Sequence, residues 1–308
     1  MRLWEAVRSF MWRHIDGLLL FDKPLEASSN MALQRVRRVF RAAKAGHTGT
    51  LDPLASGLLP ICFGQATKYS AMMLDADKTY RAVLKLGETT ATGDAEGEIL
   101  EKRAVSVEAH QIEPVLALFR GEIRQIPPMH SALKHKGKPL YAYIRAGVEI
   151  DRPERSVTIH GLVMEGYSGE ELRLTVKCSK GTYIRVLAED IGKALGCGAH
   201  LKSLVRTGIG PFDLANARTM QEIEAREDRD VLLLPCDALL ADFPRLVLEE
   251  NEALFLLNGR VVEAEAAQGC YRLYDGKARF RGLVESDGCG KIRPKRMMSV
   301  QVLEEEAF

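Results

Sequence analysis

The alternation of apolar and polar residues along this chain predicts strands and helices in an irregular order. The stretches "TYRAVLKLG" (79–87) and "ELRLTVKC" (171–178) alternate with a period of two, which is typical of strands. Residues 184–195 follow the helical period instead and stop before Gly196, a residue type that often ends helices. Because strands and helices do not alternate steadily, the pattern favours an α+β domain over a doubly wound parallel sheet.

The two ends of the chain add further patterns. "IDGLLLFDKP" (15–24) is typical of a short buried strand that ends in a Pro turn, and "SSNMALQRVRRVF" (28–40) places Ser and Asn caps before a basic amphipathic helix. From about Phe243 the chain consists of short apolar runs separated by Gly turns, which predicts a small β-barrel or sandwich. These runs are "RLVLEE", "ALFLL", "YRLYDG" and "ARFRGLV".

The length of 308 residues exceeds that of a usual compact domain, so we expect one large domain with a small appendage. Although the net charge is only +1, three stretches are rich in Lys and Arg, namely residues 27–51, residues 123–148 and "KIRPKR" (291–296). They either line a path for a polyanion or form three solvated surfaces, and the sequence leaves both readings open. The second stretch falls in a Pro-, Gly- and Lys-rich insertion that we expect to lie on the surface and to close over a ligand.

The cysteines and histidines form no metal-binding pattern. None of the six cysteines lies at C-x-x-C spacing and the seven histidines do not cluster with them, so we expect no metal site. Scattered, reduced cysteines fit the cytoplasm better than a disulfide framework would. The N-terminal segment is too short and too charged for a secretory signal or a membrane span. We therefore expect a cytoplasmic protein without a membrane partner.

The glycine-rich stretch "GHTGTLDPLASGLLPICFGQATK" (46–68) contains a single acidic residue, Asp52. It matches neither G-x-x-x-x-G-K-[ST] nor G-x-G-x-x-G, so a nucleoside triphosphate site is not expected. Glycosidases place two carboxylates across the bond that they break, whereas no second acid lies in this stretch. Asp52 and Pro53 either form an ordinary turn, or Asp52 acts alone in a reaction whose leaving group stays bound and is used again, such as attack at an anomeric carbon.

Seven blocks of the sequence together resemble one known family. They are, in chain order, "DGLLLFDKP", "SSN", the glycine-rich stretch, "DADKTYRAVLKLGETTATGDAEGEI", "PPMHSALKHKGKPLYAYIRAGVEI", "KGTYIRVLAEDIG" and "GCGAHLKSLVRT". These blocks cover most of residues 15–207 and resemble the TruB family of tRNA pseudouridine synthases. The tail from about residue 243 is similar to the RNA-binding PUA module that often follows this catalytic domain.

The resemblance implies a domain organisation. Residues 15–241 would form a pseudouridine synthase catalytic domain with a mixed, largely antiparallel central sheet. Residues 242–308 would form a small, β-barrel-like PUA domain that binds RNA. An RNA-binding thumb would be inserted at about residues 122–155, and residues 1–14 would be an N-terminal extension that family members usually lack.

The resemblance also implies an activity, the isomerisation of uridine 55 in the T loop of tRNA to pseudouridine. The enzyme would extrude the nucleotide, break the N-glycosidic bond, turn the uracil and join C5 to C1′, without cofactor, metal or ATP. We expect a monomer that contacts the T arm and needs no guide RNA, because the glycine-rich stretch resembles the guide-free enzymes. The alternative is a module that binds or folds tRNA independently of turnover.

Five residues match functional positions of that family. Asp52 matches the essential aspartate, either a nucleophile at C1′ or a base at C2′, and Arg185 matches its arginine partner. Tyr80 matches the tyrosine that stacks on the uracil, and its phenol is a candidate for removing the C5 proton. His47 matches a histidine that fills the space left by the flipped base, and Leu204 an apolar residue on the floor of the uracil pocket. Residue type alone would suggest a turn, an exposed helix arginine, a core aromatic, a loop histidine and a core leucine.

Cations of the insertion match the thumb that closes on the T arm, where they would bind phosphates. These residues are Lys134, Lys136, Lys138 and Arg145. One block departs from the family, since it usually reads P-P-M-Y-S-A and this chain has His130 in place of the tyrosine. No hydroxyl contact is therefore expected from this position.

Overall fold

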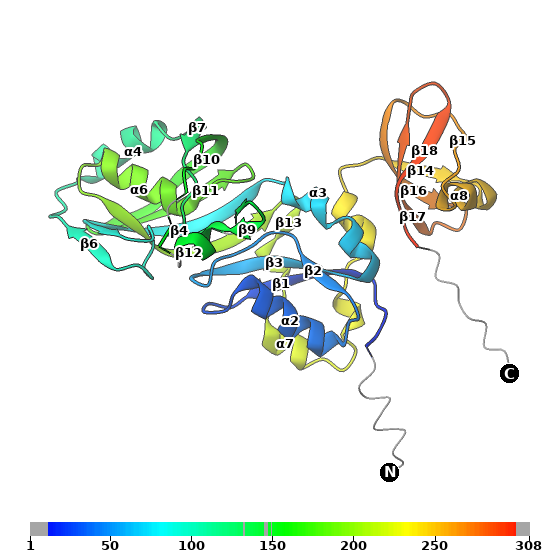
Figure 1. Ribbon diagram of the computed structural model, residues 1–308, viewed down its shortest axis with the longest axis horizontal. Helices are drawn as coiled ribbons and strands as arrows, with labels where there is room; N and C mark the ends of the chain where they lie inside the picture. Colours follow the sequence, from blue (N-terminus) through cyan, green and yellow to red (C-terminus); the bar gives the residue numbers. More distant parts are fainter. Residues whose placement is uncertain (1–11, 132, 145–146, 149, 300–308) are drawn as a thin grey trace, which may run out of the picture.

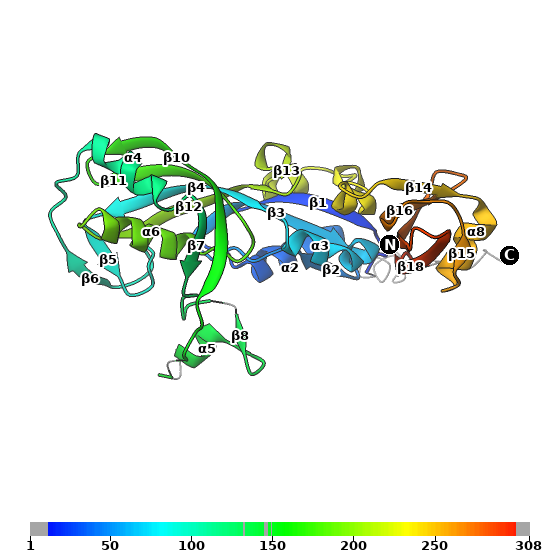
Figure 2. The same ribbon diagram turned by 90° about the horizontal axis from the view of Figure 1, so that it is seen from above.

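The computed structural model describes residues 12–131, 133–144, 147–148 and 150–299. Two sheets lie along one elongated body, with the larger sheet carrying most of the helices and the smaller one built by the C-terminal part of the chain at one end (Figures 1 and 2). No described helix is long and apolar enough to cross a membrane. Within the same residues all six cysteines are free, and no group of acidic, His and Cys side chains is suited to hold a metal ion.

The larger sheet is mixed but largely antiparallel. Its main strands are, in spatial order, β1 (Gly17–Lys23), β3 (Ala55–Phe63), β12 (Ala199–Ile209), β4 (Lys78–Leu86), β11 (Glu171–Cys178), β10 (Arg155–Ser168) and β7 (Gly121–Gln125). The strands β2 (Ala45–His47) and β13 (Phe212–Asp213) pair with β3 and β12. Among these pairs, β3 with β12 is parallel and the others are antiparallel. The predicted α+β class and the largely antiparallel sheet are therefore confirmed.

Helices cover the two halves of this sheet separately. Helix α6 (Ile184–Ala194) and helix α4 (Ala109–Ala117) pack their apolar faces against β4, β10, β11 and β12. Helix α2 (Ser29–Phe40) and the short helix α7 (Met220–Glu224) cover β1 and β3 instead. The Ser28 side chain caps α2 by accepting a hydrogen bond from the Met31 amide (3.2 Å), as the Ser-Asn start of this segment predicts. The two cores meet where β3, β12 and β4 lie side by side.

The smaller elements connect these parts. They are the short helix α3 (Ser70–Leu74), the 3-10 turns η1 (Gly64–Lys68), η2 (Leu214–Asn216), η3 (Asp230–Leu232) and η4 (Cys236–Leu240), and the hairpin of β5 (Glu88–Thr90) with β6 (Ile99–Lys102). A further segment, residues 126–154, extends away from the sheet between β7 and β10 (Figure 2). It carries β8 (Lys134–His135), β9 (Lys138–Pro139) and the short helix α5 (Leu140–Ile144). Because β7 and β10 belong to the sheet, the projecting part is slightly shorter than the predicted insertion.

The C-terminal sheet curves around one helix. Its strands are, in spatial order, β14 (Arg245–Leu248), β16 (Gly269–Asp275), β17 (Phe280–Ser286), β18 (Lys291–Met297) and β15 (Val262–Glu263). One apolar run was interpreted wrongly, since "ALFLL" is part of helix α8 (Glu250–Leu257) and not a barrel strand. Glu249 and Glu252 form a capping box at its start, a helix signal that precedes the run in the sequence.

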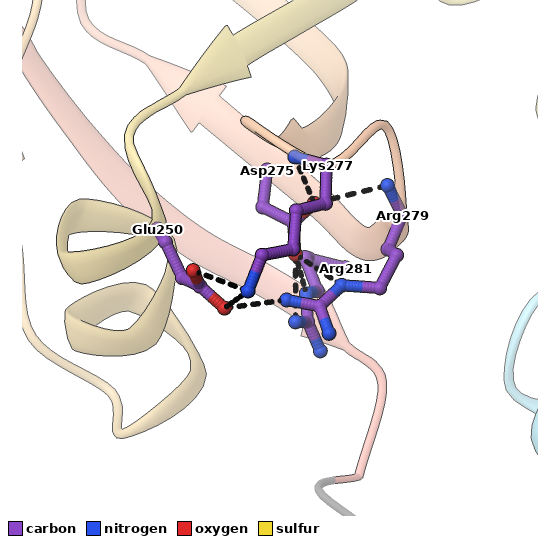
Figure 3. Close-up of polar contacts among 5 residues, drawn as sticks. All are labelled: Glu250, Asp275, Lys277, Arg279 and Arg281. Carbon is purple, nitrogen blue, oxygen red and sulfur yellow. Dashed lines mark hydrogen bonds and ion pairs between the residues drawn. The ribbon is translucent and has the colours of Figure 1, made fainter.

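A network of ion pairs ties helix α8 to the hairpin between β16 and β17 (Figure 3). The fully buried Asp275 carboxylate accepts hydrogen bonds from Arg279 Nε (2.8 Å) and Arg281 Nε (2.7 Å). Glu250 in turn accepts from Arg279 Nη2 (2.6 Å) and Lys277 Nζ (3.0 Å). Burial raises the pKa of Asp275, but the hydrogen bonds outweigh it and lower the pKa to about 2. The carboxylate thus stays charged and keeps the hairpin fixed to the helix.

Candidate active site

Asp52 lies in the loop between β2 and β3, and this loop is fixed to helix α2. The Ser29 hydroxyl donates a hydrogen bond to the Leu51 carbonyl oxygen (2.9 Å) and accepts one from the Leu51 amide (2.7 Å). The Asp52 carbonyl oxygen accepts a hydrogen bond from the Ala55 amide (3.0 Å), which closes a turn at the start of β3. The backbone of Asp52 and Pro53 therefore does form a turn, and this turn presents the carboxylate to the cavity described below.

The Asp52 carboxylate meets a buried arginine from the start of helix α6. Arg185 Nη2 lies 3.0 Å from Asp52 Oδ2, and the exposed fraction is 7% for the arginine side chain and 46% for the aspartate side chain. Burying a guanidinium is costly unless an opposite charge or hydrogen bonds compensate it, so the ion pair stabilises the buried Arg185 and fixes both groups. Arg185 therefore contacts Asp52 and is not an exposed helix residue, while its role as the partner of a catalytic aspartate stays a prediction.

A second carboxylate, which the sequence analysis missed, shares this arginine. Asp94 Oδ2 lies 3.3 Å from Arg185 Nη1, and the Asp94 side chain is only 4% exposed. The Thr92 hydroxyl and the Glu96 amide (3.1 Å) donate hydrogen bonds to Asp94 Oδ1. Asp52 is therefore not as isolated as the glycine-rich stretch suggests. No pattern in the sequence points to Asp94, because no spacing indicates that residues 94 and 185 meet.

Two backbone carbonyls complete the described surroundings of the Arg185 guanidinium. Nη2 donates to the carbonyl oxygen of His130 (2.7 Å), and Nη1 donates to that of Thr92 (3.3 Å). His130 lies at the root of the projecting segment, and Thr92 lies in the turn between β5 and β6. Arg185 therefore connects three separate loops around the Asp52 carboxylate.

A cavity of about 580 Å³ lies beside this ion pair. Four of the predicted site residues line it, namely Asp52, Tyr80, Arg185 and Leu204. Tyr80 comes from β4 and Leu204 from β12, two strands that are hydrogen-bonded neighbours. The volume falls within the range of sites that bind small molecules. The structure thus brings together a carboxylate, a cation, an aromatic ring and an apolar side chain around one cavity.

His47 lies outside the set of described residues that line this cavity. It ends β2 and is half-buried. Burial lowers the pKa of its imidazole, and the charge of Arg206 lowers it further, whereas a hydrogen bond with the Gly49 backbone raises it. A neutral imidazole is the result near neutral pH. The contact of His47 with RNA stays a prediction.

Arg206 is a second residue of interest that the sequence analysis missed. It is 1% exposed and lines the cavity from β12. Its Nε donates a hydrogen bond to the Leu58 carbonyl oxygen (2.8 Å), and its Nη2 donates one to that of Gly49 (3.3 Å). Side chains two residues apart on a strand point to the same face of the sheet. Since Leu204 was predicted to line the pocket, the position of Arg206 two residues later in "HLKSLVRT" could have indicated that it lines the pocket too.

Two buried lysines increase the positive charge near the cavity. Burial lowers the pKa of Lys78, which lines the cavity, and that of Lys23 to about 8. The Asp52 carboxylate opposes this effect at Lys23. Both ammonium groups are mostly protonated at neutral pH, so this end of the sheet has a positive potential that favours anionic ligands.

The four cations predicted to bind RNA belong to the projecting segment. Lys136 and Lys138 are exposed, Lys134 lies in β8, and Arg145 lies outside the described residues. Leu133, from the same segment, lines the cavity. The segment therefore extends from the rim of the cavity to exposed positive charges.

The sequence matches three family models in succession. They are described as TruB family pseudouridylate synthase (N terminal domain) for residues 37–184, tRNA pseudouridylate synthase B C-terminal domain for residues 185–241, and Pseudouridine synthase II TruB, C-terminal, for residues 244–298. A protein of Azoarcus sp. named tRNA pseudouridine synthase B is 56% identical over 292 residues, which cover 94% of this chain and 97% of that protein. This chain belongs to the TruB family of pseudouridine synthases. A second protein of the same name, from Methylobacillus flagellatus, is 52% identical and covers 93% of this chain and 96% of its own length.

The TruB fold is also seen in solved structures of lower sequence identity. A chain in the crystal structure of a Cbf5-Nop10-Gar1 complex has a TM-score of 0.69 at 24% identity, covering 97% of this chain and 86% of that chain. A chain of an archaeal box H/ACA sRNP Nop10-Cbf5 complex has a TM-score of 0.63 at 22% identity, and the match covers 96% of this chain and 82% of that chain. At these identities the likeness establishes a common fold.

Proposed function

We propose that this protein converts uridine to pseudouridine in tRNA and that its target is uridine 55 of the T loop. The observation that carries the proposal is the ion pair between Asp52 and Arg185 at a cavity lined by Tyr80 and Leu204. Membership of the TruB family and the name shared by the close relatives support the class of reaction and substrate.

The geometry suits a reaction at the anomeric carbon of a nucleotide. The Asp52 carboxylate is half-exposed at the cavity, so it can approach either C1′ or the C2′ proton of a ribose. Arg185 holds the carboxylate in place through a short ion pair, and Asp94 and the His130 carbonyl hold Arg185. The N1–C1′ bond then breaks, the uracil turns in the cavity, and C5 bonds to C1′. Both proposed roles of Asp52 need the same fixed carboxylate.

The walls of the cavity suit a uracil that has left its base stack. Tyr80 offers an aromatic face from β4, and Leu204 offers an apolar surface from β12. Extruding a nucleotide from a folded loop costs a few kcal/mol, which stacking in the pocket offsets. A detached uracil kept between these side chains turns and reacts again without escaping into solvent.

The exposed cations fit a path for the tRNA backbone. Lys136 and Lys138 project on the segment whose root lines the cavity, and they are free to reach phosphates once the T loop enters. The C-terminal sheet adds the basic strand β18 at the far end of the body, and we include residues 242–308 in the RNA-binding surface. We further propose a monomer that acts in the cytoplasm without guide RNA.

Tritium release tests the proposal. A tRNA labelled at uridine C5 is incubated with wild type, with Asp52→Asn and with Asp75→Asn, and the modified position is mapped afterwards. Asp75 is the matched control, because it is an exposed aspartate that pairs with Lys180 at 2.8 Å. We expect release by wild type and Asp75→Asn at position 55 and loss of release with Asp52→Asn.

Two other outcomes would change the assignment. Tritium release from a different uridine would support pseudouridine formation but would show that the target is not uridine 55. No release from a folded wild-type protein that binds tRNA would instead support a module that binds or folds tRNA without turnover.

A further inference from the structure

Tyr80 and Arg206 face each other across two neighbouring strands. Their Cα atoms are partners in the register between β4 and β12, so the two side chains project from the same face of the sheet, and both line the cavity. A side-chain hydrogen bond joins them. Because a guanidinium has donors only, the phenol oxygen is the acceptor and its own proton points away from Arg206.

Arg206 has no carboxylate partner among the described residues. Its hydrogen bonds to the protein backbone go to the carbonyl oxygens of Leu58 and Gly49, and the residue is 1% exposed. The two carboxylates nearest the reaction centre, Asp52 and Asp94, are both engaged by Arg185. A buried cation without a counter-ion is costly, so a residue of this kind is explained by a negative charge that arises beside it.

We propose that Arg206 is a positioning residue that holds the Tyr80 phenol and stabilises its phenolate, so that the Tyr80 oxygen takes the proton from C5 once the C5–C1′ bond has formed. The inference rests on the proposed function, because it concerns the last step of that reaction. The C5–H bond breaks and its electron pair forms the C5–C6 double bond, while the C6–N1 π pair moves to N1, which takes a proton from water. Before this step the phenol gives its own proton to water, so the oxygen that takes the C5 proton is a phenolate. The proton from C5 then stays on the Tyr80 oxygen, and the phenol is restored.

The charges around Tyr80 agree with this role. Burial is the main influence and raises the pKa of Tyr80, whereas Arg206 opposes it through both its charge and its hydrogen bond. Cys178 and Asp52 raise the pKa further. The other charged groups on the cavity wall, Arg185 and Lys78, are cations as well. Arg206 is therefore the cation whose contact with the phenol oxygen limits the rise of the Tyr80 pKa.

The first test follows the phenol in the free protein. Carbon-13 NMR of tyrosine labelled at Cζ reports the pKa of each phenol, and Tyr80→Phe identifies the Tyr80 signal. We expect a higher Tyr80 pKa in Arg206→Gln than in wild type, because the opposing charge is gone. Arg81→Gln is the matched control, since Arg81 is exposed, directly follows Tyr80 in β4 and points to the other face of the sheet. An equal Tyr80 pKa in wild type and a folded Arg206→Gln protein would overturn the inference.

The second test uses the milder variant Arg206→Lys, which keeps the positive charge at this position but replaces the guanidinium. We expect its turnover to fall about 10- to 100-fold with little change in KM, because the lysine cannot keep both the backbone and the phenol contacts. If removal of the C5 proton has become slow, tRNA carrying deuterium at uridine C5 gives a larger isotope effect on kcat than in wild type. An isotope effect that equals that of wild type would contradict the role assigned to Arg206.

The two tests separate the inference from the proposed function. Absence of pseudouridine in the wild-type reaction would remove the proposed function, whereas the NMR titration would still report whether Arg206 controls Tyr80. A normal wild-type reaction together with unchanged titration and isotope effects would leave the function intact and remove the role of Arg206.

Discussion

Arg185 shows how much of this site depends on one side chain. Its guanidinium contacts two carboxylates and two backbone carbonyls that come from three loops. Each contact restricts the orientation of the planar group, so the Nη2 atom that faces Asp52 has little freedom. Asp94 is the deeper of the two carboxylates, since its side chain is 4% exposed against 46% for Asp52. This difference suits a structural role for Asp94 and a reactive role for Asp52.

The substitution Asp94→Asn tests that division of roles. We expect kcat to fall about 100-fold with tRNA binding retained, because a misplaced Arg185 misplaces the Asp52 carboxylate. Single-turnover rates and tRNA affinity would be measured for this variant and for Asp77→Asn, a control at a half-buried aspartate that pairs with His160 at 3.2 Å. Wild-type turnover in Asp94→Asn would show that Asp52 needs no help from the second carboxylate.

At the scale of elements, the close pairing of β3 with β12 positions the cavity. Gly57 of β3 has φ +99°, and a Cβ atom there would lie 2.4 Å from the Arg206 carbonyl oxygen. A larger residue therefore meets both an unfavourable backbone conformation and a backbone clash. The added Cβ would push β12 away from β3. Because Leu204 and Arg206 lie on β12, the same clash would also disturb the cavity wall.

Replacing Gly57 with alanine should reveal this constraint. We expect Gly57→Ala to lower the free energy of unfolding by about 2 to 4 kcal/mol, measured by denaturant unfolding. Gly161→Ala in β10 provides the control, because its added Cβ would approach the nearest heavy atom, Lys177 Cβ, only to 3.8 Å. Equal stability of the two variants would mean that the β3–β12 pair tolerates a wider separation.

The sequence predicts the regular elements well and the site only in part. Alternation alone locates β4 and β11, and the helical period locates α6, because each buries one face against a core. Helix α8 was not predicted, because its apolar run is short and the helix signal lies in the capping box before it. The resemblance to the family supplied Asp52, Tyr80, Arg185 and Leu204, and the structure gathers them at one cavity.

Asp94 and Arg206 were not predicted, for a physical reason. Asp94 and Arg185 are far apart in the sequence, and only the fold brings them into an ion pair. A turn sequence such as "TGDAEG" is the same whether or not its aspartate pairs with a distant cation. Arg206 interrupts an otherwise apolar strand face, and a buried cation is the kind of residue that local patterns place on the surface. Long-range pairing of charges is visible only in three dimensions.

At the scale of the whole molecule, the projecting segment and the C-terminal sheet lie apart on the elongated body, and Leu133 of the projecting segment lines the cavity. The C-terminal sheet is fixed to the body, since the Tyr69 hydroxyl donates to the Arg296 carbonyl oxygen (3.0 Å) and Phe280 packs against the Tyr69 ring at 5.6 Å. The projecting segment instead extends away from the body (Figure 2). The molecule therefore combines one fixed C-terminal surface with one extended arm.

Removing charge from the arm should weaken RNA binding without changing the chemistry. We expect the double variant Lys136→Ala and Lys138→Ala to raise the KM for tRNA several-fold while kcat stays near that of wild type. The slope of log affinity against log salt concentration should fall by about two, one for each lost phosphate contact. Lys102→Ala, at an exposed lysine of β6 paired with Glu88 at 3.1 Å, is the control. An unchanged salt slope would exclude these lysines from the phosphate path.

The carbonyl of His130 gives position 130 an unusual freedom. The hydrogen bond to Arg185 comes from the main chain, which is the same in every residue, so the replacement of the family's tyrosine by histidine leaves that contact intact. A substitution here that leaves the backbone in place therefore keeps the contact that holds Arg185 against Asp52. Insertions and deletions between β7 and residue 130 are different, because they move the carbonyl itself. The contact with Arg185 therefore depends on the length of this connection more than on the side chain at position 130.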